Sequence, residues 1–580
     1  MNTPAYAIVF DQENQQWLHF TGPERVYTTL SLADVVTTIE EVEKVCRNES
    51  RWAVGWISYE AAPAFDAAFT VRDETSFPKV WFATFPPPTP LTTLPDSAPL
   101  EPLTWTPSVT RDQYLKATES VKDAIARGDT YQTNYSFRLT TATTPPPQQL
   151  FTQMTKSQGG PYGCLIHTQE FAIASASPEL FFARNGTSIV SRPMKGTSRR
   201  GRTLQEDRAL AQQLQSSIKN RAENIMIVDM TRNDLSRIAD RGSVTWPSVC
   251  EIEQYPPMFQ MTSKVIATTN ASLAEVFRAL FPAASITGAP KAATMRSIAE
   301  TESTPRRIYT GAVGVIAPND RAWFNVAIRT ALIDFTRGTT EYGVGSGIVW
   351  DSSSTDEYEE CLSKAAAITR PAHHCALFET ILWEPSKGLF LLEQHLDRMA
   401  NGAEYFGWPF DRGRALLALA QVENDIRHSD IPHRIRLFVS EHQSFTTDHS
   451  PLASLPSPYR LSLAQAPISS ADLSLYRKTT DRHAYDSALP KHPDAHDVIL
   501  WNERGEITET KIANICLEID GKLYTPPVTS GLLEGCYRGV LVAAGEITER
   551  VLTVEDLKRS TRILLLNSLR RSWEGILCKD

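Results

Sequence analysis

The sequence lacks several features that would assign it to common classes of protein. No apolar run approaches the roughly 20 residues that span a bilayer. Acidic residues outnumber basic ones, 67 to 58, which excludes the basic excess typical of proteins that bind nucleic acid or anionic membranes. The N-terminal stretch MNTPAYAIVFDQENQ has no basic segment and no long apolar core, so we expect no signal peptide.

Cysteine is also scarce, and the cysteines do not have the spacing of a metal-binding motif. The eight cysteines include no C-x-x-C pair, so they suit reduced thiols better than a disulfide framework or a zinc site. Hydrophobic residues make up 42% of the chain and charged residues 22%, which is typical of a globular protein with a sizeable core. We therefore expect a cytoplasmic enzyme that binds neither nucleic acid nor membrane.

The 580 residues are too many for one ordinary domain, and two stretches divide them. Residues 86–110 form a proline-rich linker, because eight prolines between Phe85 and Pro107 exclude a helix or a central strand. Residues 369–375 form a second linker between a helical pattern and a new strand pattern. The predicted domains are an N-terminal subdomain (1–85), a central domain (111–368) and a C-terminal domain (376–580).

Strand patterns outnumber helical ones without strict alternation, which favours an α+β layered fold over a doubly wound parallel sheet. We expect helices over 31–48, 112–127, 203–220, 355–368 and 393–407. We expect strands over 53–58, 79–85, 162–167, 171–176, 179–184, 312–317, 322–332, 342–349 and 376–383.

Charged residues on the predicted helix 355–368 are candidates for metal binding. Glu357 and Glu360 share a face, and Lys364 follows one turn later. With Glu223 from another helix, these carboxylates could hold Mg²⁺, which prefers oxygen ligands. Upstream, the glycine-rich stretch 343–347 follows a strand, and its N–H groups could cradle a carboxylate. Taken alone, the same residues also fit a solvated helix face and an ordinary turn.

Nine motifs in fixed order resemble those of the chorismate-utilising enzymes, and among them the aminodeoxychorismate synthases (component I). They are GDTYQTNYS (128–136), SPELF (177–181), RPMKGTSRRG (192–201), AENIMIVDMTRNDLSRI (222–238), FPAASITGAPK (281–291), YTGAVG (309–314), IRTA (328–331), GVGSGIVWDS (343–352) and EYEECLSKA (357–365). The resemblance covers residues 110–368 strongly and the first 85 loosely. It implies a layered α/β sandwich.

The resemblance also implies roles for individual residues. Mg²⁺ would bind the ring carboxylate of chorismate through Glu223, Glu357 and Glu360. Glu179 would protonate the departing C4 hydroxyl as a general acid. The substrate, including its enolpyruvyl carboxylate, would be held by further residues of the same motifs: Tyr309, Arg329, Lys364, the N–H groups of Gly345, Ser346 and Gly347, and also Gln132 and Thr287.

Two positions distinguish the reactions of this family. Lys195 stands where anthranilate synthases usually carry alanine, and in aminodeoxychorismate synthases this lysine attacks C2 covalently before ammonia enters at C4. Gln132 stands where isochorismate and salicylate synthases carry a lysine that activates water. The pair therefore favours amination at C4.

Motifs of the C-terminal domain resemble class IV pyridoxal-phosphate enzymes, with a D-amino-acid-aminotransferase-like α+β fold, and especially aminodeoxychorismate lyases. They are FET (378–380), EQHLDRMANGAEYFG (393–407), YRKTT (476–480), WNERGEITETKIANICLE (501–518), GLLEGCYRG (531–539) and LLLNSLRR (564–571). The resemblance implies that Lys478 forms a Schiff base with the cofactor and that Glu509 binds its pyridine nitrogen. The phosphate would contact Arg398, the N–H groups of Cys536 and Tyr537 at a helix start, and Asn567 and Ser568.

Together the two resemblances imply that chorismate and ammonia are converted to p-aminobenzoate and pyruvate for folate biosynthesis. They also imply a separate glutamine amidotransferase partner and a homodimer formed through the C-terminal domain.

Two alternatives stay open. One is an anthranilate synthase-like first half fused to a class IV aminotransferase. The other makes one half a scaffold without catalysis, because Asn224 and Gln260 replace usual histidines and little sequence precedes Phe378.

Overall fold

The computed structural model describes residues 5–95, 97–369, 375–441 and 443–578. It divides into two compact units: the first comprises Met1–Arg200 and Ala211–Ala372, and the second comprises Gly201–Leu210 and His373–Asp580. Among the described residues, no helix combines the length and the apolar character needed to cross a membrane.

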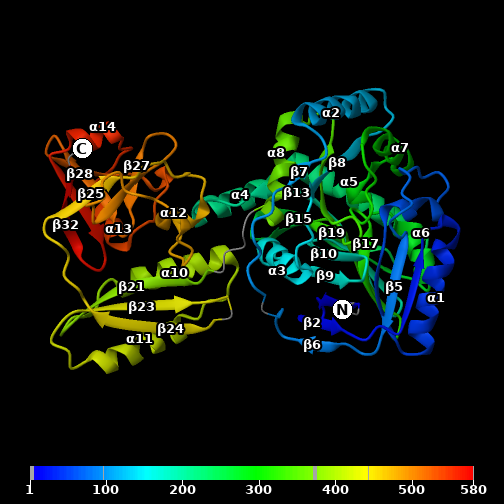
Figure 1. Cartoon of the computed structure of the whole chain (residues 1–580), viewed down its shortest axis with the longest axis horizontal. Helices are drawn as coiled ribbons and strands as arrows, with labels where there is room; N and C mark the ends of the chain where they lie inside the picture. The colour runs from blue at the N-terminus through cyan, green and yellow to red at the C-terminus, as the bar shows by residue number, and fades with distance from the viewer. Residues whose placement is uncertain (1–4, 96, 370–374, 442, 579–580) are drawn as a thin grey trace. The chain divides into compact units, whose positions relative to one another are not determined.

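Two antiparallel sheets, each of ten described strands, form the centre of unit 1 (Figure 1). The first runs in the order β16 (Gly288–Ala289), β8 (Gln132–Thr141), β20 (Thr339–Ile348), β19 (Thr330–Asp334), β10 (Phe171–Ser177), β9 (Tyr162–His167), β1 (Tyr6–Asp11), β2 (Gln16–Phe20) and β6 (Thr89–Leu91), with β7 (Thr106–Pro107) beside β8. Within its described residues, the proline-rich stretch thus contributes only the short strands β6 and β7.

The second sheet is built in the same way from other segments. Its order is β13 (Met194–Arg199), β15 (Met258–Thr268), β12 (Ser188–Arg192), β11 (Leu180–Asn185), β18 (Arg321–Val326), β17 (Ala312–Ala317), β4 (Trp52–Ile57), β5 (Val80–Phe85) and β3 (Arg25–Thr29), with β14 (Thr245–Gln254) beside β15. The first 85 residues are shared between both sheets, because β1 pairs with β9 and β4 pairs with β17.

Apolar side chains of the two sheets meet between them, among them Val9, Ile166, Trp56 and Val315. The outer face of the second sheet is covered by α1 (Val35–Asn48), α5 (Ile218–Ser236) and α6 (Leu273–Leu280), and that of the first by α2 (Arg111–Ala126), α3 (Pro147–Gln158) and α8 (Ser354–Lys364). Both faces of the central strands are covered, so their residues are apolar on both sides. β17 accordingly has the continuous apolar sequence AVGVIA.

Shorter helical segments connect these elements. They are η1 (Leu32–Asp34), η2 (Tyr59–Ala64), η3 (Ala284–Ile286), α7 (Lys291–Thr301), α9 (Ala366–Thr369) and α4 (Leu204–Ser216), of which the residues up to Leu210 belong to unit 2.

Three predicted elements of this unit are wrong in their bounds. The single strand 322–332 is two strands, because the chain leaves the second sheet after Val326 and enters the first at Thr330, with Arg329 at a left-handed φ of 51°. The helix 203–220 breaks at Ser217, whose hydroxyl caps α5. The helix 355–368 is also divided, because α8 ends at Lys364.

Unit 2 contains two further sheets. The smaller is β22 (Gly388–Leu389), β21 (Leu377–Glu384), β23 (His433–Val439) and β24 (Phe445–Pro451). The larger is β27 (Ile507–Thr510), β26 (Asp497–Trp501), β25 (Tyr459–Leu463), β32 (Arg571–Leu577), β31 (Arg562–Asn567), β28 (Asn514–Ile519), β29 (Lys522–Thr525) and β30 (Thr548–Glu549), with a further pairing of β27 to β28. The helical segments are α10 (Leu392–Phe406), α11 (Arg412–Ile426), η4 (Leu473–Tyr476), α12 (His483–Asp486), η5 (Val528–Ser530), α13 (Cys536–Ala543) and α14 (Val554–Arg559).

Along β21 and β23, side chains point alternately to the two faces of the sheet, so that one face packs into the core and the other is open. Leu377, Ile381 and Ile435 are buried in the core with residues of α10 and α11. The residues between them therefore point the other way, and Phe378 and Arg434 line a cavity on that side. Unit 1 has antiparallel sheets, unit 2 has one antiparallel and one mixed sheet, and helices cover them in both units, which confirms the predicted α+β class.

Candidate active sites

A cavity of about 250 Å³ in unit 1 collects residues from distant parts of the sequence. Ten of the predicted site residues line it: Glu179, Lys195, Glu223, Tyr309, Arg329, Gly345, Gly347, Glu357, Glu360 and Lys364. Most of them come from β13, α5, β20 and α8. Glu179 directly precedes β11, Tyr309 lies just before β17, and Arg329 ends the crossing between the two sheets.

Lys195 projects from β13, and its Nζ donates a hydrogen bond to Oδ1 of Asn134 at 3.2 Å. Burial in the cavity wall lowers the pKa of this amine, while the nearby carboxylate of Glu223 opposes the shift. A side chain at Gly347 would place its Cβ 2.4 Å from Lys195 Nζ. Glycine at 347 therefore makes room for the amine.

The two residues that depart from the family pattern both bind the backbone around this lysine. Nδ2 of Asn224 donates to the carbonyl of Lys195 at 3.0 Å, and Nε2 of Gln260 donates to the carbonyl of Gly196 at 2.8 Å. Both side chains are buried. The amides thus anchor β13 at the position of the amine, and Asn224 and Gln260 fit the fold of the site.

Glu179 lies at the start of β11 and is only 2% exposed. Burial raises the pKa of its carboxyl to about 7, although the hydroxyl of Ser285 donates to Oε1 at 2.5 Å. The position beside Lys195 and the raised pKa suit a group that gives up a proton near neutral pH.

The three glutamates predicted to bind Mg²⁺ face the same cavity. Glu357 accepts a hydrogen bond from Ser352 Oγ at 2.7 Å, and Glu360 pairs with Lys364 at 2.6 Å. Burial raises the pKa of Glu223, and the other two carboxylates raise it further. A hard cation relieves such repulsion, so three carboxylates suit Mg²⁺ chemically, although among the described residues their oxygens do not all lie within 4.8 Å of one another.

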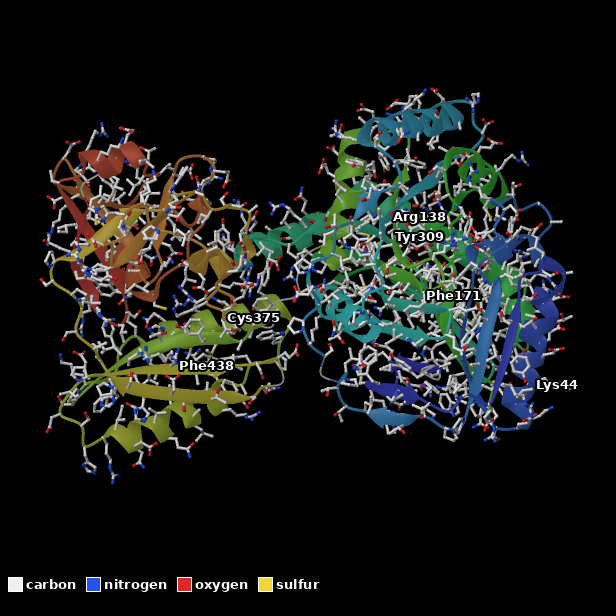
Figure 2. All side chains as sticks on the ribbon, in the orientation of Figure 1. Lys44, Arg138, Phe171, Tyr309, Cys375 and Phe438 are labelled. Carbon is white, nitrogen blue, oxygen red and sulfur yellow. The ribbon has the colours of Figure 1, made fainter. Side chains whose placement is uncertain are left out.

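The residues predicted to hold the substrate's carboxylate are fixed by further contacts. Lys364 Nζ donates to the carbonyl of Gly345 at 2.9 Å, and Arg329 donates to Gln158 Oε1 at 2.8 Å. The ring of Tyr309 lies against the guanidinium of Arg138, whose Cζ is 4.8 Å from the ring centroid (Figure 2).

Three predicted substrate-binding residues lie outside the cavity lining. Thr287 Oγ1 donates to the carbonyl of Ala283 at 3.0 Å, and Ser346 Oγ bonds to the hydroxyl of Tyr114 at 2.9 Å. Gln132 is fully buried, and within the described chain neither of its side-chain polar atoms has a hydrogen-bond partner. Its Nε2 lies beside Gly347, 2.5 Å from where a Cβ would stand, so Gln132 is next to the cavity.

A second cavity, of about 370 Å³, lies in unit 2. Six of the residues predicted to bind a cofactor line it: Arg398, Lys478, Glu509, Cys536, Asn567 and Ser568. The seventh, Tyr537, follows Cys536 in α13, and its ring centroid is 6.1 Å from that of Phe390.

Lys478 and Glu509 have opposite pKa shifts in this cavity. Burial, followed by the positive charge of Arg398, lowers the pKa of Lys478 to about 8. Burial raises the pKa of Glu509 to about 7, and its oxygens accept hydrogen bonds from the hydroxyl of Tyr485 at 2.7 Å and from Nδ2 of Asn514 at 3.0 Å. A readily deprotonated amine and an oriented carboxylate are what a pyridoxal-phosphate site requires.

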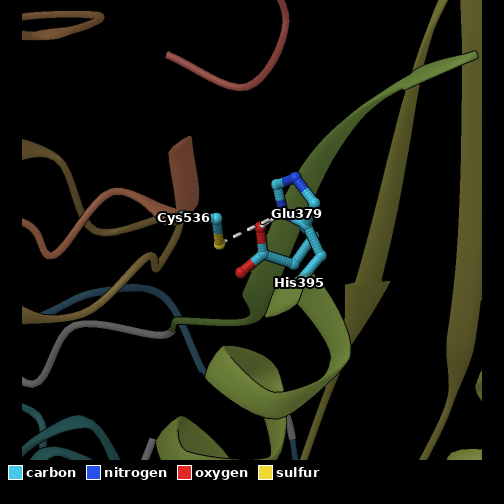
Figure 3. A group of neighbouring side chains, drawn as sticks. All are labelled: Glu379, His395 and Cys536. Carbon is cyan, nitrogen blue, oxygen red and sulfur yellow. Dashed lines mark hydrogen bonds and ion pairs between the residues drawn. The ribbon is translucent and has the colours of Figure 1, made fainter. Parts of the chain in front are cut away.

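The buried carboxylate of Glu379, drawn with His395 and Cys536 in Figure 3, holds Arg398. Its guanidinium donates to both oxygens of Glu379, at 2.8 and 2.6 Å, and Nδ1 of His395 lies 2.6 Å from the second oxygen. Despite burial, Arg398 and His395 hold the pKa of Glu379 at about 2.

Glu379, His395 and Cys536 have the spacing of metal ligands, and within the described residues they are the only such group. Arg398 contacts both carboxylate oxygens of Glu379, so the structure favours an ion-pair network that orients Arg398.

The start of α13 completes a cradle for an anion. No side chain caps the helix at Gly535, so the first N–H groups are open toward the cavity that Gly535 and Cys536 line. A Cβ at Gly535 would lie 2.0 Å from Oδ1 of Asn514. These residues fit the phosphate of pyridoxal phosphate.

Several of the contacting residues were not assigned roles from the sequence. Asn134, Ser285 and Glu379 lie within quoted motifs, so their positions were visible but their partners were not. Tyr485 lies outside every motif, and no feature of the sequence marks it as the donor to Glu509.

Comparisons with known proteins match the chain to two family models in separate segments. Residues 4–370 match the model of the chorismate binding enzyme family, and residues 376–574 match that of amino-transferase class IV. Aminodeoxychorismate synthase component 1 of Bacillus subtilis (strain 168) is 38% identical over 263 residues, 45% of this chain and 56% of that protein. Anthranilate synthase component 1 3 of Haloarcula marismortui is 38% identical over 252 residues, 43% of this chain and 49% of that protein.

The chain therefore spans about half the length of the curated relatives that it matches. Among solved structures, anthranilate synthase component I from Streptococcus pneumoniae TIGR4 has a TM-score of 0.52 and 22% sequence identity, covering 63% of this chain and 91% of that one. This likeness shows a shared fold. Since the first family model matches well over half of its length, the chain belongs to the family of chorismate binding enzymes.

Proposed function

We propose that this chain makes p-aminobenzoate from chorismate in two steps. Unit 1 would aminate chorismate at C4 to give 4-amino-4-deoxychorismate, and unit 2 would release pyruvate from that product. The observation that carries the proposal is the lysine at 195, which points into the first cavity beside Glu179. The two 38% identical relatives, an aminodeoxychorismate synthase and an anthranilate synthase, do not decide between amination at C4 and at C2.

In the first step Lys195 acts as the nucleophile. Its neutral amine would form a bond to C2 while the C4 hydroxyl leaves with a proton from Glu179. Ammonia then bonds to C4, and Lys195 is released from C2 with its electron pair. Glu223, Glu357 and Glu360 would hold Mg²⁺, whose charge neutralises the ring carboxylate. Lys364 and Arg329 would bind the enolpyruvyl carboxylate.

In the second step Lys478 acts as the base. Pyridoxal phosphate supplies an electron sink to the carbon that bears the amino group. Lys478 would remove the proton at C4, and the enolpyruvyl group would leave as pyruvate while the ring becomes aromatic. Glu509 would hold the pyridine nitrogen, and Arg398 with the N–H groups of Cys536 and Tyr537, and with Asn567 and Ser568, would hold the phosphate.

The source of ammonia is a further part of the proposal. We infer a separate glutamine amidotransferase partner, so the chain alone should use ammonium and fail with glutamine. The homodimer and the cytoplasmic location expected from the sequence stay predictions.

The decisive test is a product assay on the purified chain with chorismate, ammonium, Mg²⁺ and pyridoxal phosphate. Chromatography and mass spectrometry should find p-aminobenzoate and pyruvate in equal amounts. Anthranilate as the product would support the first alternative, a C2-aminating half fused to an aminotransferase. Unconsumed chorismate would instead identify unit 1 as a scaffold.

The pH dependence of the first step should follow Glu179. A general acid must be protonated, and the pKa of Glu179 is raised to about 7, so amination should decline as the pH rises through about 7. The rate of chorismate consumption at saturating ammonia, measured from pH 6 to 9, checks this. In Glu179→Gln the rate should be low and this alkaline decline should vanish; an unchanged profile in the variant would assign the titration to another group.

Two glycine substitutions in the same helix segment test the proposed phosphate cradle. Gly535→Ala would push a methyl group against Asn514, which is held by Glu509, and should weaken pyridoxal-phosphate binding by roughly tenfold to a hundredfold. Gly539→Ala meets no atom within 4 Å and should bind normally. Titration of the apoprotein, followed by cofactor absorbance, measures both dissociation constants. Equal affinity in the two variants would contradict the cradle.

A further inference from the structure

The cavity of unit 2 carries far more positive than negative charge. Its lining includes seven cationic side chains and a single carboxylate, that of Glu509. The cations are Arg398, Arg434, Arg436, Lys478, Arg482, Lys511 and Arg570. A cofactor phosphate accounts for about two negative charges, which leaves an excess of cations that an uncharged or zwitterionic substrate does not neutralise.

Several of these cations have partners of their own. Arg398 pairs with Glu379, and Arg436 pairs with Asp448 at 2.6 Å. Arg482 stacks on the ring of Tyr485 at 4.3 Å and donates to the carbonyl of Lys511 at 2.5 Å.

Arg434 and Arg570 differ from them. Neither forms an ion pair with an acidic side chain in the part of the chain that the structure describes, and Nε of Arg434 is buried without a hydrogen-bond partner there. Arg570 donates to the carbonyl of Ala453 at 2.9 Å. Burial and the positive charge of Arg434 lower the pKa of Arg570. Two guanidinium groups that repel each other in one cavity are stabilised when an anion binds both.

The fold directs these two side chains to the same cavity from different sheets. Arg434 stands on β23, opposite Leu382 of β21, and the neighbouring Ile435 points into the core on the other face. Arg570 lies in the turn between β31 and β32, two residues after Ser568, and Asn567 and Ser568 line the same cavity. Both therefore share a cavity with Lys478.

We propose that Arg434 and Arg570 form a carboxylate-binding site that selects a dicarboxylate substrate in unit 2. This inference rests on the proposed function, since 4-amino-4-deoxychorismate carries a ring carboxylate and an enolpyruvyl carboxylate. An ordinary α-amino acid has a single carboxylate beside its amine. Planar guanidinium groups bind carboxylates in a forked geometry, so a second carboxylate held away from Lys478 distinguishes the two classes.

The test uses the full chain loaded with pyridoxal phosphate and supplied directly with 4-amino-4-deoxychorismate, so that unit 1 is bypassed. Pyruvate release gives KM and kcat for Arg434→Gln, Arg570→Gln and the control Arg559→Gln, which removes an exposed cation of α14 that is paired with Asp556 and does not line the cavity. Each of the first two should raise KM by roughly tenfold to a hundredfold, with kcat within about threefold of the parent. The control should change KM by less than about threefold, and all three should retain the visible absorption of bound cofactor.

A binding experiment separates failure of this inference from failure of the proposed function. If the parent chain does not turn over 4-amino-4-deoxychorismate, the function assigned to unit 2 is wrong. Benzene-1,3-dicarboxylate and benzoate, titrated against cofactor absorbance, still test the site. Tighter binding of the dicarboxylate by the parent, lost in Arg434→Gln and Arg570→Gln, supports it. Equal binding by parent and variants, or a fall in kcat at constant KM, overturns it.

Discussion

Lys195→Ala is expected to abolish formation of 4-amino-4-deoxychorismate, with a loss of at least roughly a thousandfold in chorismate consumption. The expectation follows from the position of the amine, which is fixed by Asn134 and by the amides that hold the β13 backbone. Its lowered pKa makes the neutral, nucleophilic form more abundant. The measurement is the rate of chorismate loss with ammonium and Mg²⁺, together with the identity of any amino product.

Two further variants serve as controls for this experiment. Lys195→Arg keeps the positive charge but removes the nucleophilic amine, so it should be as inactive as the alanine variant. Lys116→Ala removes an exposed lysine of α2 and should behave as the parent chain. Retained activity in Lys195→Ala, with anthranilate as its product, would show that the lysine takes no part and that ammonia enters at C2.

Lys478→Ala is expected to stop the pathway one step later, so that 4-amino-4-deoxychorismate accumulates while chorismate is consumed at the parental rate. Alanine can neither bond to the cofactor nor remove the C4 proton, and the loss of pyruvate release should exceed roughly a thousandfold. Because the lysine lies in unit 2, the first step should be unaffected. Chromatography of the reaction mixture over time measures both steps at once.

The cofactor gives this second variant an independent readout. The visible absorption that arises from the bond between Lys478 and pyridoxal phosphate should disappear, whereas Lys522→Ala, an exposed lysine of β29, should retain it. Normal pyruvate release from Lys478→Ala would mean that another base serves unit 2, and the assignment of this lysine would then be wrong.

The sequence was most informative about site residues that lie in short motifs. Lys195, Glu179 and the helix glutamates lie in short motifs, and the structure brings them to one cavity. The contacts between distant segments could not be predicted in the same way. Ser285 meets Glu179 across 106 residues, and Gly347 must be small only because Lys195 approaches it. Such pairings depend on sheet order, which periodicity does not specify.

Some predicted strands and helices had the wrong bounds for a related reason. Residues 322–332 have the composition of one strand, and the interruption at Arg329 comes from a change of sheet that apolar patterning cannot indicate. The sequence of α4 and α5 predicts one continuous helix because helix periodicity continues through Ser217. Only the hydroxyl of Ser217, which caps α5, marks the break.

The early strands have a consequence for how the chain acquires its structure during synthesis. β1 pairs with a strand that begins at Tyr162, and β4 pairs with one that begins at Ala312. When the first 85 residues leave the ribosome, β1 has β2 beside it and β4 has β5, but the partners of their other edges have not yet been made, and β4 waits for β17 until more than half of the chain is synthesised. Long-range pairing of this kind folds slowly and leaves apolar edges open. We expect the nascent first unit to depend on a holding chaperone until β17 has emerged.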